Sequence, residues 1–132
     1  LGKLICFWDD NSITIEGDTG LAFTEDVLKR YEAYGWQTLR IEDVNDLSAI
    51  DWAIEAAKSD PRPTMVGVKT IIGYGSPNKA GSEEAHGAPL GAEEIKLTKA
   101  QLGWPSTEAF HVPEEALEKM REQRQRGADL QK

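Results

Sequence analysis

The chain has 132 residues, enough for one modest domain with a hydrophobic core. Its formal net charge is −8, and glutamates interrupt its densest basic stretch, residues 119–126, which argues against a nucleic-acid partner. No apolar stretch approaches the ~20 residues that cross a bilayer, so a membrane is not an expected partner either.

The chain has a single cysteine, Cys6, in the middle of an apolar run. It cannot form an intrachain disulfide, and we expect it to be a small buried core residue. This use of cysteine fits a reducing compartment and favours a cytoplasmic location.

The first half of the chain alternates between strand and helix patterns. Apolar runs rich in β-branched side chains predict strands at residues 4–8, 36–41 and 64–72. Apolar residues at helical spacing predict a helix from Thr24 to Gly35 and a second one that opens at Asp46 or Ser48. This β-α-β-α-β order predicts an α/β fold with a parallel sheet and flanking helices.

The second half begins with a long glycine-rich loop, residues 73–91. A loop of this length in a compact domain is either disordered or functional. A helix is expected over residues 92–102, and a last helix from near Pro113. The sequence becomes polar at Gln123, where we expect the helix to fray.

Two loops follow the carboxyl ends of predicted parallel strands, where ligands bind in such sheets. They contain Asp10, Asn11, a main-chain carbonyl near Ile13, and His86. Oxygen donors of this kind suit Mg²⁺ or Ca²⁺ beside a phosphorylated ligand, and a histidine can donate to phosphate. The alternative is a polar turn that caps a strand, with a surface histidine. The pattern alone leaves both interpretations open.

Four blocks of the sequence carry a more specific signal. One block runs from Leu-Gly-Lys-Leu-Ile into Asp-Asp-Asn-Ser-Ile-Thr-Ile-Glu-Gly, another is Arg-Tyr-Glu-Ala-Tyr-Gly-Trp, and a third is Thr-Ile-Ile-Gly-Tyr-Gly-Ser-Pro-Asn-Lys-Ala-Gly. A fourth, His-Gly-Ala-Pro-Leu-Gly, begins at His86. In this order the blocks resemble the transketolase family over roughly residues 1–120.

The resemblance implies a homodimeric thiamine diphosphate enzyme that transfers a two-carbon ketol unit between sugar phosphates. It implies that Mg²⁺ or Ca²⁺ ties the diphosphate to the protein through the Asn11 side chain and the Ile13 main-chain carbonyl. Ile15 and Ile72 match apolar positions that line the cofactor. His86 matches a catalytic histidine that contacts the diphosphate and borders the substrate channel.

The chain also departs from the family pattern. The family's Gly-Asp-Gly motif, which supplies a metal-binding aspartate, precedes the Leu-Gly-Lys opening, and the glutamate that activates the cofactor belongs to a later domain. Members often carry an extra histidine where this chain has Glu83 or Glu84. We therefore expect residues 1–122 to be part of the diphosphate-binding domain, residues 123–132 to be a polar tail toward a linker, and the isolated chain to be inactive.

Three alternatives remain at this level. The chain could come from dihydroxyacetone synthase or deoxyxylulose-phosphate synthase, which share this chemistry. It could be a non-catalytic module kept for cofactor binding or association. A plastid location also stays open beside the cytoplasm.

Overall fold

A computed structural model describes residues 2–131, and its centre is a three-stranded parallel sheet in the order β1-β5-β4. The strands are β1 (Ile5–Asp10), β4 (Gln37–Ile41) and β5 (Thr64–Lys69). Both neighbours pair with β5 in parallel, so that Asp10 lies opposite Lys69 at the carboxyl ends of β1 and β5. The loops that leave these two strands therefore begin side by side.

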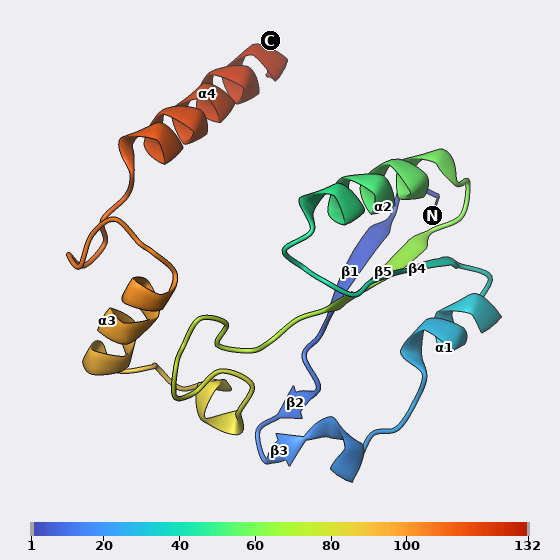
Figure 1. Ribbon diagram of the computed structural model, residues 1–132. Coiled ribbons are helices and arrows are strands. Elements are labelled where there is room, and N and C mark those ends of the chain that lie inside the picture. The colour runs from blue at the N-terminus through green and yellow to red at the C-terminus, as the bar shows by residue number, and fades with distance from the viewer. Residues whose placement is uncertain (1, 132) are drawn as a thin grey trace.

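Helices cover the two faces of the sheet (Figure 1). Helix α2 (Leu47–Ser59) packs Ala53 into the core formed with Ile41, Val66 and Val68. Helix α1 (Val27–Ala33) lies on the opposite face, where its Leu28 side chain approaches Gly67. Neighbouring residues of β5 point to opposite faces, so this one strand serves both helices.

Aspartates cap the starts of α1 and α2, and a glycine follows the end of α1. The carboxylates of Asp26 and Asp46 accept the main-chain N–H groups of residues three positions later, both at 3.1 Å, and so cap α1 and α2. Gly35, with φ of 81°, follows the last turn of α1 and sends the chain into β4.

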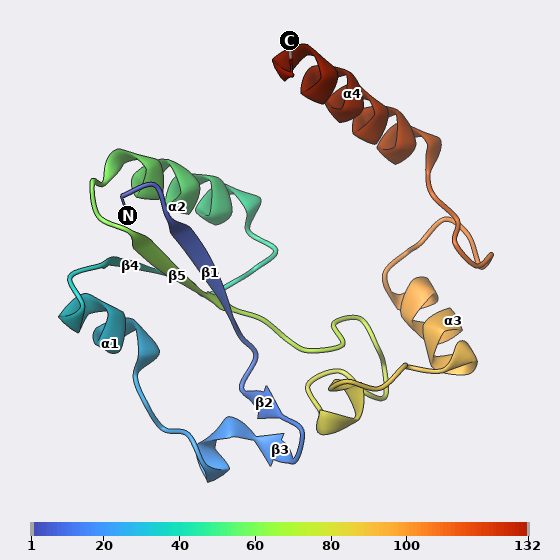
Figure 2. The ribbon, with the colours of Figure 1, turned by 180° about the vertical axis from the view of Figure 1, so that it is seen from behind.

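The rest of the chain leaves the carboxyl end of the sheet (Figures 1 and 2). After β1 comes a small antiparallel hairpin with a 3-10 turn, and after β5 a long loop with another 3-10 turn, then two helices that lie away from the sheet. These elements are β2 (Ile13–Thr14), β3 (Gly17–Asp18), η1 (Thr19–Leu21), η2 (Glu83–Ala85), α3 (Ala92–Gln101) and α4 (Glu114–Leu130). Within residues 2–131 no helix has both the length and the apolar character to cross a membrane.

The structure confirms the predicted α/β class, the parallel sheet and the order of its elements. Several boundaries differ from the predicted ones, most clearly those of β1, β5 and α1. Strand β1 continues to Asp10 because its acidic end still pairs with β5, and β5 stops at Lys69 instead of residue 72. Helix α1 begins later, at Val27, because Asp26 and not Thr24 caps it.

Two further expectations need correction. Helix α4 does not fray at Gln123 but continues to Leu130. Cys6 is half-buried and not fully buried, since it lies on β1 at the edge of the sheet. The predicted division at residues 122 and 123 falls inside α4 and stays a prediction, and its outer ends, residues 1 and 132, lie outside the described residues.

Candidate functional site

The loop that follows β1 is held in one conformation by its own side chains. The Asn11 Oδ1 atom accepts the main-chain N–H of Ile13 at 2.9 Å. Between them Ser12 has a φ of 63°, a left-handed conformation that costs a non-glycine residue on the order of 1 kcal/mol or more. Three polar contacts around this turn offset that cost, so that the Asn11 side chain and the Ile13 main chain are fixed together.

Two of these contacts reach Ser12 from elsewhere in the fold. The Lys69 ammonium, at the end of β5, donates to Ser12 Oγ at 2.6 Å, and the Thr19 N–H donates to the Ser12 carbonyl at 2.9 Å. The strained residue is therefore tied both to the neighbouring strand and to the 3-10 turn η1.

The two carboxylates at the end of β1 already have partners. Asp10 pairs with Arg40 of β4 at 2.7 Å, and this hydrogen bond raises the pKa of the Arg40 guanidinium above its ordinary value. Asp9 accepts a hydrogen bond from the Thr70 hydroxyl, at the start of the second loop. These contacts stabilise the carboxyl edge of the sheet and leave Asn11 and Ile13, both half-buried, as the residues whose oxygen atoms could bind a ligand.

A cavity of about 330 Å³ opens over this loop. Asn11 and Ile13 line it together, with polar and aromatic side chains around them, namely Trp8, Asp9, Asp10, Ser12, Thr19, Phe23 and Glu25. Ile15, Ile72 and His86 are not among the residues that line it. Of the predicted site residues, the structure thus brings Asn11 and Ile13 to one cavity.

Ile15 has 71% of its surface exposed beside the β2-β3 hairpin, whereas Ile72 is half-buried at the start of the second loop. The Ile72 carbonyl accepts the N–H of Gly81 at 2.8 Å, which folds the loop back on itself. Gly73 makes this fold possible, because its φ is 64° and a Cβ there would lie 2.9 Å from the Ala85 methyl.

His86 follows the 3-10 turn η2 in this loop and is half-buried. Its main-chain N–H donates to the Glu83 carbonyl at 2.9 Å. The position of the imidazole therefore depends on how the whole loop is folded.

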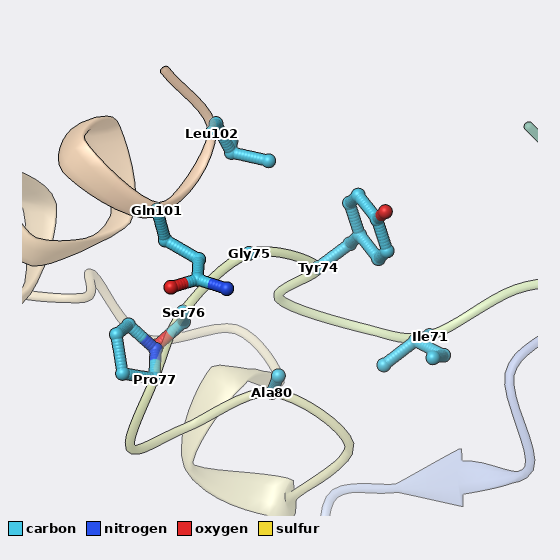
Figure 3. A pocket seen from close by; sticks show the side chains of 8 residues that line it. All are labelled: Ile71, Tyr74, Gly75, Ser76, Pro77, Ala80, Gln101 and Leu102. Carbon is cyan, nitrogen blue, oxygen red and sulfur yellow. The ribbon is translucent and has the colours of Figure 1, made fainter. Parts of the chain in front are cut away.

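A second cavity, of about 390 Å³, lies where this loop meets the end of α3 (Figure 3). The loop supplies Ile71, Tyr74, Gly75, Ser76, Pro77 and Ala80, and the helix end supplies Gln101 and Leu102. Its lining is mostly apolar, and the predicted site residues are not part of it.

One buried side chain of this region was missed by the sequence analysis. The Glu94 carboxylate, on α3, accepts hydrogen bonds from the Asn78 amide at 2.8 Å, from the Asn78 main chain at 2.9 Å and from the Ser76 hydroxyl. Hydrogen bonds from Asn78 and then Ser76 hold the pKa of Glu94 below its ordinary value. In the sequence it resembles the exposed Glu93 beside it, and nothing in the pattern separates the two.

The donor set after β1 suits a hard divalent cation. Among residues 2–131 there is no group of three or more His, Cys, Asp or Glu side chains that could hold a metal. Asn11 Oδ1 keeps a second lone pair beyond the one used by Ile13, and an Ile13 carbonyl is an oxygen ligand of the kind that Mg²⁺ and Ca²⁺ accept. These residues fit part of a coordination shell.

Comparison with known families assigns the chain. The family described as transketolase, thiamine diphosphate binding domain, matches residues 1–132. The chain belongs to the transketolase family.

Individual transketolases are similar to it in sequence and in structure. Transketolase 2 of Aliivibrio fischeri is 59% identical over 115 residues, and the transketolase of Halalkalibacterium halodurans is 48% identical over 129 residues, which are 87% and 98% of this chain. The crystal structure of Pichia stipitis transketolase in complex with sedoheptulose 7-phosphate is 43% identical over 98% of the chain, with a TM-score of 0.89.

The chain spans less than a fifth of these transketolases. The matched part is 17% of the Aliivibrio fischeri protein and 19% of both the Halalkalibacterium halodurans protein and the Pichia stipitis chain. The part of a transketolase to which the chain corresponds is sequence of the family's thiamine diphosphate-binding domain.

Proposed function

We propose that this chain supplies one part of the thiamine diphosphate and metal site of a transketolase. In the complete enzyme it would serve the transfer of a two-carbon ketol unit between sugar phosphates. The observation that carries the proposal is the fixed turn from Asn11 to Ile13, at the carboxyl end of β1, in a chain that matches the transketolase domain along its whole length.

The metal ligands proposed in this chain are the Asn11 side chain and the Ile13 carbonyl, for Mg²⁺ or Ca²⁺. A divalent ion suits this acidic chain, because a diphosphate would otherwise add negative charge beside Asp9 and Asp10. Thiamine diphosphate, when bound, supplies a stabilised carbanion for the ketol unit. The Ser12 contacts to Lys69 and Thr19 support the proposal, since they hold both ligands in place before any ion arrives.

Three further residues are proposed to contact the cofactor. Ile15 and Ile72 would cover its apolar part, and the exposure of Ile15 fits a side chain that packs on a molecule or chain outside these residues. His86 would donate a hydrogen bond to the diphosphate and border the channel for the sugar phosphate. Its glycine-rich loop allows the close backbone approach that such a contact needs.

The substrates, the assembly and the location are also proposals. One Pichia stipitis transketolase structure is a complex with fructose 6-phosphate and another a complex with sedoheptulose 7-phosphate, which supports sugar phosphates as the substrate class. We propose a homodimer for the complete protein, a cytoplasmic location, and the division into residues 1–122 of the cofactor domain and 123–132 as the lead into a linker.

A hybrid enzyme tests this function. The 115 matched residues of the chain replace the corresponding segment of Aliivibrio fischeri transketolase 2, and calorimetry follows thiamine diphosphate binding with and without Mg²⁺. We expect Mg²⁺-dependent binding and ketol transfer from fructose 6-phosphate. A hybrid with the circular dichroism of the parent enzyme and no cofactor binding would refute the proposal.

The matched control for Asn11 in this hybrid is Asn45→Ala. Asn45 is also a loop asparagine after a strand, but its side chain donates to Asp43 at an exposed position. Asn11→Ala should weaken Mg²⁺-dependent binding, whereas Asn45→Ala should leave it unchanged.

A further inference from the structure

The buried Glu94 carboxylate closes a loop that contains His86. Glu94 has only 8% of its surface exposed, and its partners Ser76 and Asn78 lie 18 and 16 positions earlier in the chain. His86 lies between these two ends. Because the carboxylate ties one end of the segment to the other, it removes much of the conformational freedom of the residues between them.

The loop between Ser76 and Glu94 is rich in glycine, so a contact that restrains both of its ends matters for its conformation. Gly81, Gly87 and Gly91 all have positive φ, and glycine has the largest conformational entropy of any residue in the unfolded chain. Helix α3 begins at Ala92, and its cap residue Gly91 provides no side-chain hydrogen bond; Glu94, in the first turn, joins this end of the helix to the loop. Lys79 adds a nearby positive charge on the loop side.

A series of hydrogen bonds runs from Glu94 to Ala85, the residue before His86. The Ser76 hydroxyl donates to Glu94 and accepts the Lys79 N–H at 3.1 Å, and the Lys79 carbonyl accepts the Ser82 hydroxyl at 2.8 Å. The Ser82 carbonyl then accepts the Ala85 N–H at 3.2 Å, directly before His86. Each bond fixes the next turn of the loop.

We propose that Glu94 is a positioning residue that sets the place of His86 in the transketolase site, and this inference rests on the function proposed above. Glu94 acts through the segment from Ser76 to Ala85 and touches neither cofactor nor substrate. The loop of Asn11 is braced separately, by Lys69 and Thr19, so loss of Glu94 should leave the metal ligands in place.

The variant Glu94→Gln in the hybrid enzyme tests the proposal. The amide keeps the volume of the carboxylate but presents an N–H₂ group to donors that need an acceptor. Glu93→Gln is the matched control, since Glu93 is the neighbouring acid, lies exposed, and pairs with Lys96 at 2.7 Å. Ser76→Ala is a second variant, which weakens the same tie from the loop side.

The first measurement is hydrogen exchange of the amides of residues 73–91 in the protein without cofactor. We expect faster exchange in Glu94→Gln and Ser76→Ala, and unchanged exchange in Glu93→Gln. Equal protection in all of them would overturn the proposal, and this readout does not depend on the enzyme's activity.

The second measurement is kinetic. We expect Glu94→Gln to lower kcat/KM for the sugar phosphates at least tenfold and to change the apparent Mg²⁺ affinity less than twofold, because a small displacement of a reacting group is costly. In a His86→Ala background the same change should have no further effect on kcat/KM, since Glu94 acts through His86. Additive losses would overturn the proposal, whereas failure of the unchanged hybrid to bind cofactor would refute the proposed function instead.

Discussion

Replacement of Asn11 by alanine removes two different contributions that the structure assigns to one side chain. The first is the 2.9 Å hydrogen bond from the Ile13 N–H, which is partly buried and contributes about 0.5–1.5 kcal/mol. Without this hydrogen bond, fewer contacts stabilise Ser12 in its left-handed conformation, with φ of 63°. We expect the free energy of unfolding to fall by about 1 kcal/mol, which lowers the melting temperature by roughly 3–5 °C.

The second contribution is the proposed metal ligand. Loss of one ligand should lower the affinity for Mg²⁺ about tenfold or more, measured as Mg²⁺-dependent binding of thiamine diphosphate in the hybrid enzyme. Asn11→Asp is the matched variant, because a carboxylate oxygen still accepts the Ile13 N–H, and its stability should stay within about 0.5 kcal/mol of the unchanged protein. If Asn11→Ala melted early but bound Mg²⁺ normally, Asn11 would be only a structural residue and the ligand assignment would be wrong.

Three other predictions follow from single contacts. Ile41, with 1% of its surface exposed, lies in the core, so Ile41→Ala should lower the free energy of unfolding by about 2–5 kcal/mol in urea denaturation, and a loss below about 1 kcal/mol would contradict this packing. Gly75→Ala would place its Cβ 2.6 Å from Leu102 Cγ, whereas Gly87, which has a similar φ, has no neighbour within 4 Å of such a Cβ. We therefore expect Gly75→Ala to lower the melting temperature more than Gly87→Ala does, and Leu102→Ala to restore part of that loss. Equal losses in the two glycine variants would exclude the contact between Gly75 and Leu102. Hydrogen bonds from Arg62 lower the pKa of Asp60 to about 2 from an ordinary 3.8. A carboxyl group with a lowered pKa stabilises the fold at pH values above its ordinary pKa, and this stabilisation is lost as the pH falls toward 2. Between about pH 4 and pH 2 the unchanged protein should therefore lose more stability than Asp60→Asn, followed by circular dichroism, and parallel acid curves would contradict it.

The fold could be predicted from the sequence where local chemistry and burial agree. Asp46 can cap a helix and Gly35 can end one whatever surrounds them, and the apolar residues of β5 leave only a buried strand as their place. The end of β1 was harder to predict from the sequence, because aspartates such as Asp9 and Asp10 are typical of a turn. They remain in the strand since Thr70 and Arg40, distant in sequence, satisfy their carboxylates.

The site was predictable only where its residues are close in sequence. Asn11 and Ile13 are two positions apart, and their shared turn follows from the local chain. Lys69 is 57 positions from Ser12, and Glu94 is 16 positions from Asn78, so these contacts follow only from the topology of the sheet and the fold of the loop. In the sequence, Lys69 and Glu94 resemble ordinary exposed charged residues.

The strand order β1-β5-β4 has a consequence for how the protein is made. Strands β1 and β4 emerge from the ribosome before β5, but they do not pair with each other, and each pairs with β5, which lies roughly 60 residues after β1. Until β5 is complete, the edges of β1 and β4 that pair with it in the folded protein are left open. Insertion of the last strand between the first two is thus the step at which this part of the chain becomes folded, and the interval before it is when binding by a chaperone would protect it most.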